Sequence, residues 1–90
     1  MHAVIVQVSI NDFERGREFL TTQVVPRVSQ APGFVAGYWA RMPDDHGRSM
    51  IVFDSEEAAQ AAKQMVEANS PVDDAVTLES VDVGEVVASA

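Results

Sequence analysis

The chain has 90 residues, 47% of them hydrophobic, and its 14 acidic and six basic residues give a formal net charge of −8 at pH 7. This composition is typical of a folded chain and predicts a single domain spanning residues 1–90. The acidic balance excludes a nucleic-acid partner, because binding to a phosphate backbone needs clustered Lys and Arg. No apolar run approaches about 18 residues, so we expect no membrane-spanning helix and no membrane partner.

Cysteine is absent from the chain. Its absence excludes disulfides, thiolate nucleophiles and cysteine metal sites, and it fits a protein of the cytoplasm. The chain opens directly on the apolar segment His2 to Val6 with no positively charged segment before it. This start predicts a first strand rather than a signal peptide.

The segment from Met1 to Ile10 alternates two apolar faces and is rich in Val and Ile, which predicts a strand with both faces at least half buried. Asp12 then offers a helix N-cap. A helical stripe follows, which predicts a helix of about five turns. Pro26 lies inside the pattern and lacks an amide N–H, so we expect a kink or a break near Thr22 to Val25. The stripe consists of Phe13, Arg17, Leu20, Val24 and Val28.

Pro32 and Gly33 end the helical pattern, and a second strand is expected from Phe34 to Met42. A turn-rich segment from Pro43 to Gly47 and an apolar segment from Arg48 to Phe53 then predict a hairpin. Strict alternation along the second strand would divide its residues between two faces. Val35, Gly37, Trp39 and Arg41 would share one face, and Phe34, Ala36, Tyr38, Ala40 and Met42 the other.

The second predicted helix runs from Glu56 to Asn69, is rich in alanine, and has two acids in its first turn, where they favour the helix N-terminus. Residues 69–71, Asn-Ser-Pro, are expected to stop it. A polar loop at residues 73–74 leads to a last β segment from Val76 to Val87, with Gly84 as the point of interruption.

The order of predicted elements is therefore β-α-β-β-α-β. It indicates a ferredoxin-like α+β fold, with a four-stranded antiparallel sheet and two helices on one face. Each strand supplies apolar groups to both faces, so the sheet face without helices needs a cover. A second copy of the chain is the simplest cover, and we expect a homodimer formed through this sheet face.

Four segments carry a resemblance to the dimeric α+β barrel superfamily, and most of all to its small antibiotic-biosynthesis-monooxygenase-like domains. They are residues 25–28 (Val-Pro-Arg-Val), 31–34 (Ala-Pro-Gly-Phe), 38–39 (Tyr-Trp) and 54–58 (Asp-Ser-Glu-Glu-Ala). The resemblance implies a dimer with the same fold. It also implies a small-molecule site between sheet and helices, in which a cofactor-independent monooxygenase would act on an ionised aromatic or polyketide-like substrate.

The chain departs from the haem-degrading members, which use a histidine on or near the second helix. Here the segment from Glu56 to Asn69 contains none, and we expect no cofactor. The cofactor-free oxygenases resemble one another in pocket Asn, Trp and Tyr side chains, and no clear Asn-Trp pair matches here. The resemblance therefore assigns no catalytic residue.

Trp39 and Arg41 are the first candidates for ligand binding. Trp39 either lines a pocket and stacks on a flat substrate or fills the sheet–sheet interface of a dimer. Arg41 on the same face either holds a substrate carboxylate or enolate, or pairs with an acid. Tyr38 points to the opposite face, and which of the two faces lies under the helices is left open by the pattern.

Gln7 and Ser9 are further candidates, because polar side chains on an otherwise apolar strand could orient a ligand or satisfy a neighbouring strand. We expect no metal site, since the adjacent loop residues Asp44, Asp45 and His46 have poor geometry for converging on an ion. Two hypotheses remain: an enzyme of the monooxygenase type, and a non-catalytic ligand-binding or assembly domain of the same fold. A convergent set of polar groups in one pocket would favour the enzyme.

Overall fold

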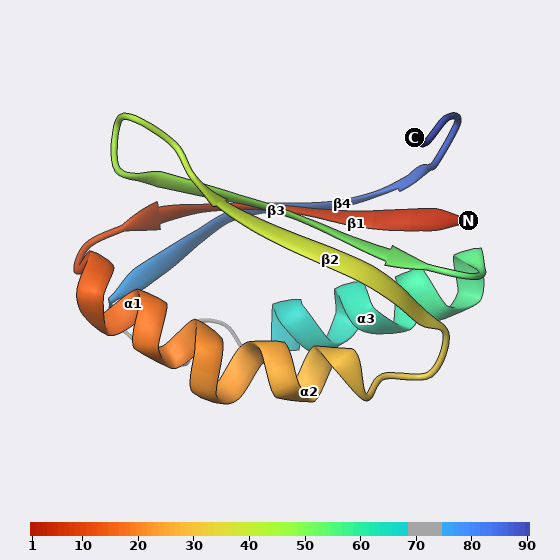
Figure 1. The fold of residues 1–90 in the computed structure, drawn as a ribbon, viewed down its shortest axis with the longest axis horizontal. Coiled ribbons are helices and arrows are strands. Elements are labelled where there is room, and N and C mark those ends of the chain that lie inside the picture. The colour runs from red at the N-terminus through yellow and green to blue at the C-terminus, as the bar shows by residue number, and fades with distance from the viewer. Residues whose placement is uncertain (69–74) are drawn as a thin grey trace.

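The computed structural model describes residues 1–68 and 75–90, and its elements follow the predicted order (Figure 1). The sheet has the strand order β2-β3-β1-β4, and all neighbouring strands are antiparallel. The helices lie on one face of it, which confirms the ferredoxin-like α+β fold. The elements are β1 (His2–Ile10), α1 (Phe13–Phe19), the π-helical segment η1 (Leu20–Val24), α2 (Val25–Ser29), β2 (Phe34–Arg41), β3 (His46–Phe53), α3 (Glu56–Ala68) and β4 (Val76–Glu85).

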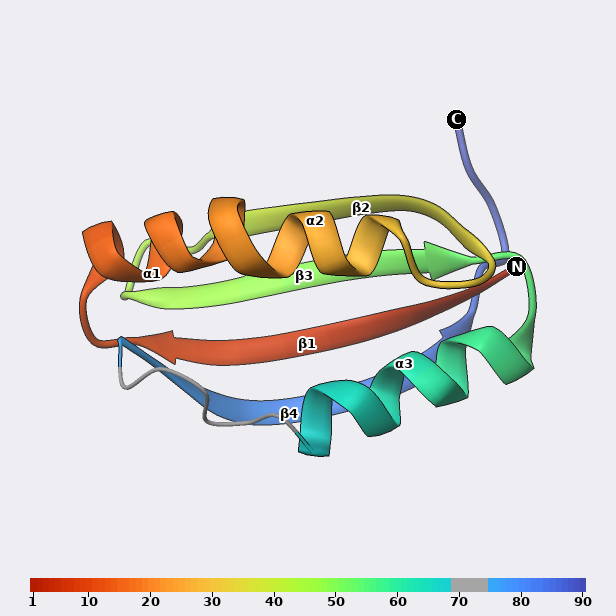
Figure 2. The same ribbon diagram turned by 90° about the horizontal axis from the view of Figure 1, so that it is seen from below.

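The helices cover different parts of one face of the sheet, here called the inner face. Viewed from the helix side, α1 and α2 lie over β2 and β3, α3 lies along β4, and β1 is visible between them (Figure 2). The contacts agree, because α2 packs on β2 while α3 packs on β4 and β1. The buried core is small and lies between the two middle strands and the helices; it consists of Val4, Val6, Ile51, Phe53 and Ala59.

The first helical segment begins as predicted and is distorted near the predicted place. The Asp12 side chain accepts a hydrogen bond from the Arg15 amide at 3.2 Å, which is the expected N-cap. The helix does not break before Pro26. Instead it widens into a π-helical turn, in which the Val25 N–H donates to the carbonyl of Leu20. The proline ring would clash with a carbonyl one turn back, and a wider turn relieves that clash.

Two bulges overturn the strict alternation expected from the sequence. Phe34 pairs with Phe53 and Ala36 with Val52, so Val35 is an extra residue in β2. Phe34 therefore shares a face with Trp39 rather than with Tyr38. A similar shift lies in β4 at Glu79, which has no partner in the ladder with β1. An extra residue reverses which face the following side chains occupy.

Strand boundaries differ modestly from those predicted. β3 begins at His46, earlier than Arg48, and β2 ends at Arg41. β4 passes Gly84 without a break and ends at Glu85, before the predicted end at Val87. The expected helix stop and polar loop at residues 69–74 lie outside the described residues. Within the described part of the chain, no helix is long and apolar enough to cross a membrane.

The turn between α2 and β2 depends on Gly33. Its φ is +81°, a left-handed conformation that side chains rarely adopt. A Cβ on this residue would lie 2.6 Å from Oδ1 of Asp54 and 2.9 Å from Cβ of Ala58. The Asp54 N–H donates to the Gly33 carbonyl at 2.8 Å, so this turn also ties β2 to the start of α3.

We expect Gly33→Ala to lower the free energy of unfolding by about 1–3 kcal/mol, because it adds backbone strain and two close contacts. Urea unfolding followed by circular dichroism measures the change. Gly84→Ala is the matched control, since a Cβ there has no atom within 4 Å. Equal stability of the two variants would contradict this account of the turn.

Candidate ligand-binding cavity

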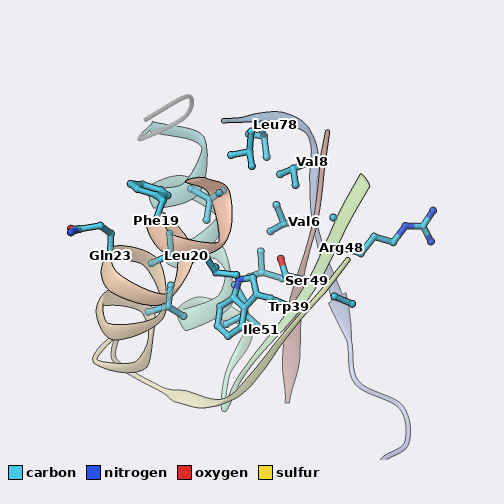
Figure 3. Close-up of a pocket in the computed structure, with 18 of the residues that line it drawn as sticks. Val6, Val8, Phe19, Leu20, Gln23, Trp39, Arg48, Ser49, Ile51 and Leu78 are labelled. Carbon is cyan, nitrogen blue, oxygen red and sulfur yellow. The ribbon is translucent and has the colours of Figure 1, made fainter. Parts of the chain in front are cut away.

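A cavity of about 590 Å³ lies between the inner sheet face and the helices (Figure 3). Its volume is within the range of small-molecule sites. The segment from α1 to α2 lies over β2 and β3, and α3 packs on β4 and β1; side chains from both groups of helices and from the sheet line the cavity. Every strand and every helix contributes to its mainly apolar lining, which includes Val6, Val8, Leu20, Trp39, Ile51 and Leu78.

Trp39 lies on the cavity side of the sheet. It pairs with Ser49 in the β2–β3 ladder, and its indole lines the cavity beneath the helices. The alternative that Trp39 fills an interface on the other sheet face is therefore wrong. The ring lies along the strand over Gly37, where a Cβ would be 2.8 Å from Cη2 of the indole. The glycine thus leaves the space in which the indole sits.

The other sheet face, here called the outer face, holds three of the candidates named from the sequence. Tyr38 is 71% exposed there and pairs with Met50. Gln7 accepts a hydrogen bond from the Ser80 hydroxyl at 3.4 Å, and Ser9 pairs with His46 in the ladder between β1 and β3. The sheet separates these side chains from the cavity, so the structure does not bring all the candidates together.

Arg41 stands at one end of the cavity. Its guanidinium carbon is 4.0 Å from the ring centroid of Phe13, so the arginine stacks on Phe13. Its Nη2 is also 3.4 Å from Oδ1 of Asp45. Both of these side chains are largely exposed, at 51% and 72%, and such ion pairs are weak.

Ser49 is a cavity residue that the sequence analysis missed. Its side chain is 9% exposed, and its hydroxyl lies toward the cavity (Figure 3). No hydrogen bond to another residue in the described part of the chain satisfies this hydroxyl. One signal could have identified it, because Ser49 is the hydroxyl-bearing residue among the inward positions of β3. The others are Gly47, Ile51 and Phe53.

The charged residues in the described lining of the cavity are all positively charged. Four of its described residues are arginines and none is acidic, although the chain as a whole carries −8. Arg48 contributes its backbone, since its side chain points away from the cavity (Figure 3). Arg17, Arg27 and Arg41 remain as side chains that can meet a ligand, and acids are kept out of the described lining.

The two histidines of the chain lie elsewhere. His2 Nε2 is 3.3 Å from the carboxylate of Glu56, and His46 Nε2 is 3.5 Å from that of Glu79. Neither histidine lines the cavity. Haem iron is usually held by His, Cys or Tyr, with Met joining His in cytochromes. Of these ligands the described lining offers the half-exposed Met65 thioether alone, so the described residues do not fit a haem iron.

Solved structures with a similar fold include two of MhuD. A mutant of MhuD with two manganese protoporphyrin IX molecules per active site has a TM-score of 0.73 and 18% identity, over 100% of this chain and 98% of that one. The haem degrader MhuD of Mycobacterium tuberculosis, with two haems in its active site, has a TM-score of 0.67 and 20% identity, over 100% and 99%.

A third structure is the monooxygenase of the gene ActVA-Orf6 from Streptomyces coelicolor, in complex with nanaomycin D. Its TM-score is 0.58 at 12% identity, over 98% of this chain and 92% of that one. No protein-family model matches the sequence, and no curated protein matches it. The chain therefore shares the ferredoxin-like α+β fold of these structures, and at these identities the likeness extends to the fold alone.

Proposed function

We propose that this protein binds a flat, largely apolar small molecule in the cavity, stacked on Trp39. The cavity itself carries the proposal, because an apolar space of about 590 Å³ with an aromatic wall suits a fused-ring ligand. The Ser49 hydroxyl, which is turned toward this space, would hydrogen-bond an oxygen on the ring system. The three similar structures hold porphyrins or nanaomycin D, and their fold supports the proposal.

The finer proposal is cofactor-independent monooxygenation of an aromatic or polyketide-like substrate. The ionised ring would pass one electron to O₂, and the two radicals would join in a C–O bond to give a peroxide. Cleavage of the O–O bond with loss of water then leaves a quinone, so one oxygen atom ends in the product and one in water. The described lining has no Asp, Glu, His or Lys to remove the first proton, so the substrate would bind already ionised.

The alternative is a non-catalytic ligand-binding protein of the same fold. The absence of a general base from the described lining favours it, because proton removal in enzymes normally uses a side chain within hydrogen-bonding reach. The two proposals share the cavity and differ only in whether the bound molecule reacts.

We also propose that the outer face joins two copies of the chain. Tyr38 and Met50 pair across β2 and β3 and are 71% and 40% exposed. Exposed apolar side chains on a sheet face indicate an interface, and two-fold dimers are the commonest assembly of soluble chains.

Anthraquinone should quench the fluorescence of Trp39, which is the sole Trp of the chain. Ala62→Phe should weaken this binding at least about tenfold, since the added ring would fill part of the cavity that Ala62 lines. Ala61→Phe is the matched control, because Ala61 is exposed and absent from the lining. Fluorescence titration measures both, and equal affinities would contradict the proposed site.

A turnover assay distinguishes the monooxygenase from the non-catalytic binding protein. At alkaline pH, where anthrone is ionised in solution, anthrone plus O₂ should give anthraquinone plus water, with one O₂ consumed for each quinone formed. We expect the rate to exceed that of protein-free buffer and to fall in Ala62→Phe but not in Ala61→Phe. An oxygen electrode and quinone absorbance measure it. Binding of anthraquinone without turnover of anthrone would support the non-catalytic alternative.

Tyr38→Asp should raise the dissociation constant of the dimer at least about tenfold, because a carboxylate would be buried without a partner. Its high exposure in the single chain predicts that the fold survives the change. Sedimentation velocity over a range of concentrations measures the assembly. Gln64→Asp, on an exposed position of α3, should sediment like the unmodified protein.

A further inference from the structure

We propose that Arg17 and Arg41 together bind an anionic group of the ligand at the Phe13 end of the cavity. The ligand would then be an amphipathic anion, with an apolar ring system on Trp39 and a carboxylate or ionised enol between the two guanidinium groups. This inference rests on the proposed binding function and names the ligand class for the same site.

Phe13 places the two arginines near each other. Arg17 lies one helical turn after Phe13 on the same side of α1, and residues so spaced are neighbours on a helix surface. Arg41 comes from β2 and sits 4.0 Å above the Phe13 ring. Both arginines line the cavity. A helix and a strand therefore supply two cations to one end of an apolar space.

Arg17 occupies a position where an apolar residue would be expected. The other members of its stripe on this helical segment are apolar. Within the described residues Arg17 makes no ion pair, although Glu14 and Glu18 lie nearby on the same helix. A cation on the cavity side that is left unpaired by nearby acids is available for a ligand.

Arg41 has an acidic partner, Asp45, but the ion pair between them is weak. Asp45 reaches it at 3.4 Å between two largely exposed side chains, and exposed pairs of this kind contribute little. The stack on Phe13 orients the guanidinium and leaves its edge for an acceptor. Two cations at one end without an acid in the described lining repel each other, and a bound anion relieves that repulsion.

Arg27 is not part of this group. It is ten residues beyond Arg17, which is roughly 15 Å along a helix axis. A single carboxylate cannot span that separation. The anion site is therefore assigned to the Phe13 end alone, where Arg41 stacks on the ring and Arg17 follows Phe13 by one helical turn.

The test compares two probes that differ in charge, anthracene-2-carboxylate and anthracene-2-carboxamide, by quenching of Trp39. We expect the carboxylate to bind at least about tenfold more tightly than the amide. Its affinity should fall as NaCl is raised while that of the amide stays constant, because salt screens partly exposed charges. Equal affinity for both probes would overturn the inference and leave the proposed function standing. Binding of neither probe would overturn both.

Arg17→Gln and Arg41→Gln should each weaken carboxylate binding at least about fivefold and leave amide binding unchanged. The amide thus reports that the cavity is intact in each variant. Arg48→Gln is the matched control, since it removes the same charge from a side chain that points away from the cavity. Loss of carboxylate affinity in Arg48→Gln equal to that in Arg17→Gln would show a general charge effect and overturn the inference.

Discussion

The register of β2 against β3 is the constraint on which the site depends. Side chains alternate along a strand, so a slip of one residue would exchange the two faces. The ladder pairs Trp39 with Ser49 and so places both on the cavity side, while the Tyr38–Met50 pair is placed on the outer face. The hairpin holds this register at one end, where Asp45 adopts a φ of +59° and the Met42 N–H donates to the His46 carbonyl at 2.7 Å.

The cavity follows from how the helices meet this sheet. α2 packs on β2, α3 packs on β4, β1 and β3, and side chains from both helices line the cavity above the inner face. The π-helical turn before Pro26 forms part of the wall there, and such turns often occur at functional sites. Apolar strand residues line the floor, whereas arginine is the charged residue of the described lining. The described lining therefore combines apolar side chains with positively charged ones.

The similar structures share this architecture but the residues around the cavity decide what it can do. The MhuD structures hold haem or manganese protoporphyrin IX and the ActVA-Orf6 monooxygenase holds nanaomycin D, whereas the cavity of this chain is described by its own lining. The residues here do not suit a haem iron, because both histidines pair with glutamates away from the cavity. A fold can thus be kept while the chemistry of its site changes.

The sequence by itself determined the order of the elements, the Asp12 cap, the distortion before Pro26 and the turn at Gly33. These features depend on local physics, such as a missing N–H or a left-handed φ. It also singled out Trp39 and Arg41. Only the tertiary structure decided that their face lies under the helices, because both faces of the strand carry apolar residues and the packing of distant segments selects one. The bulge at Val35, which brings Phe34 to the same face as Trp39, likewise arises from pairing with β3. The place of Ser49 in the cavity and the stacking of Arg41 on Phe13 likewise required segments far apart in the chain to meet.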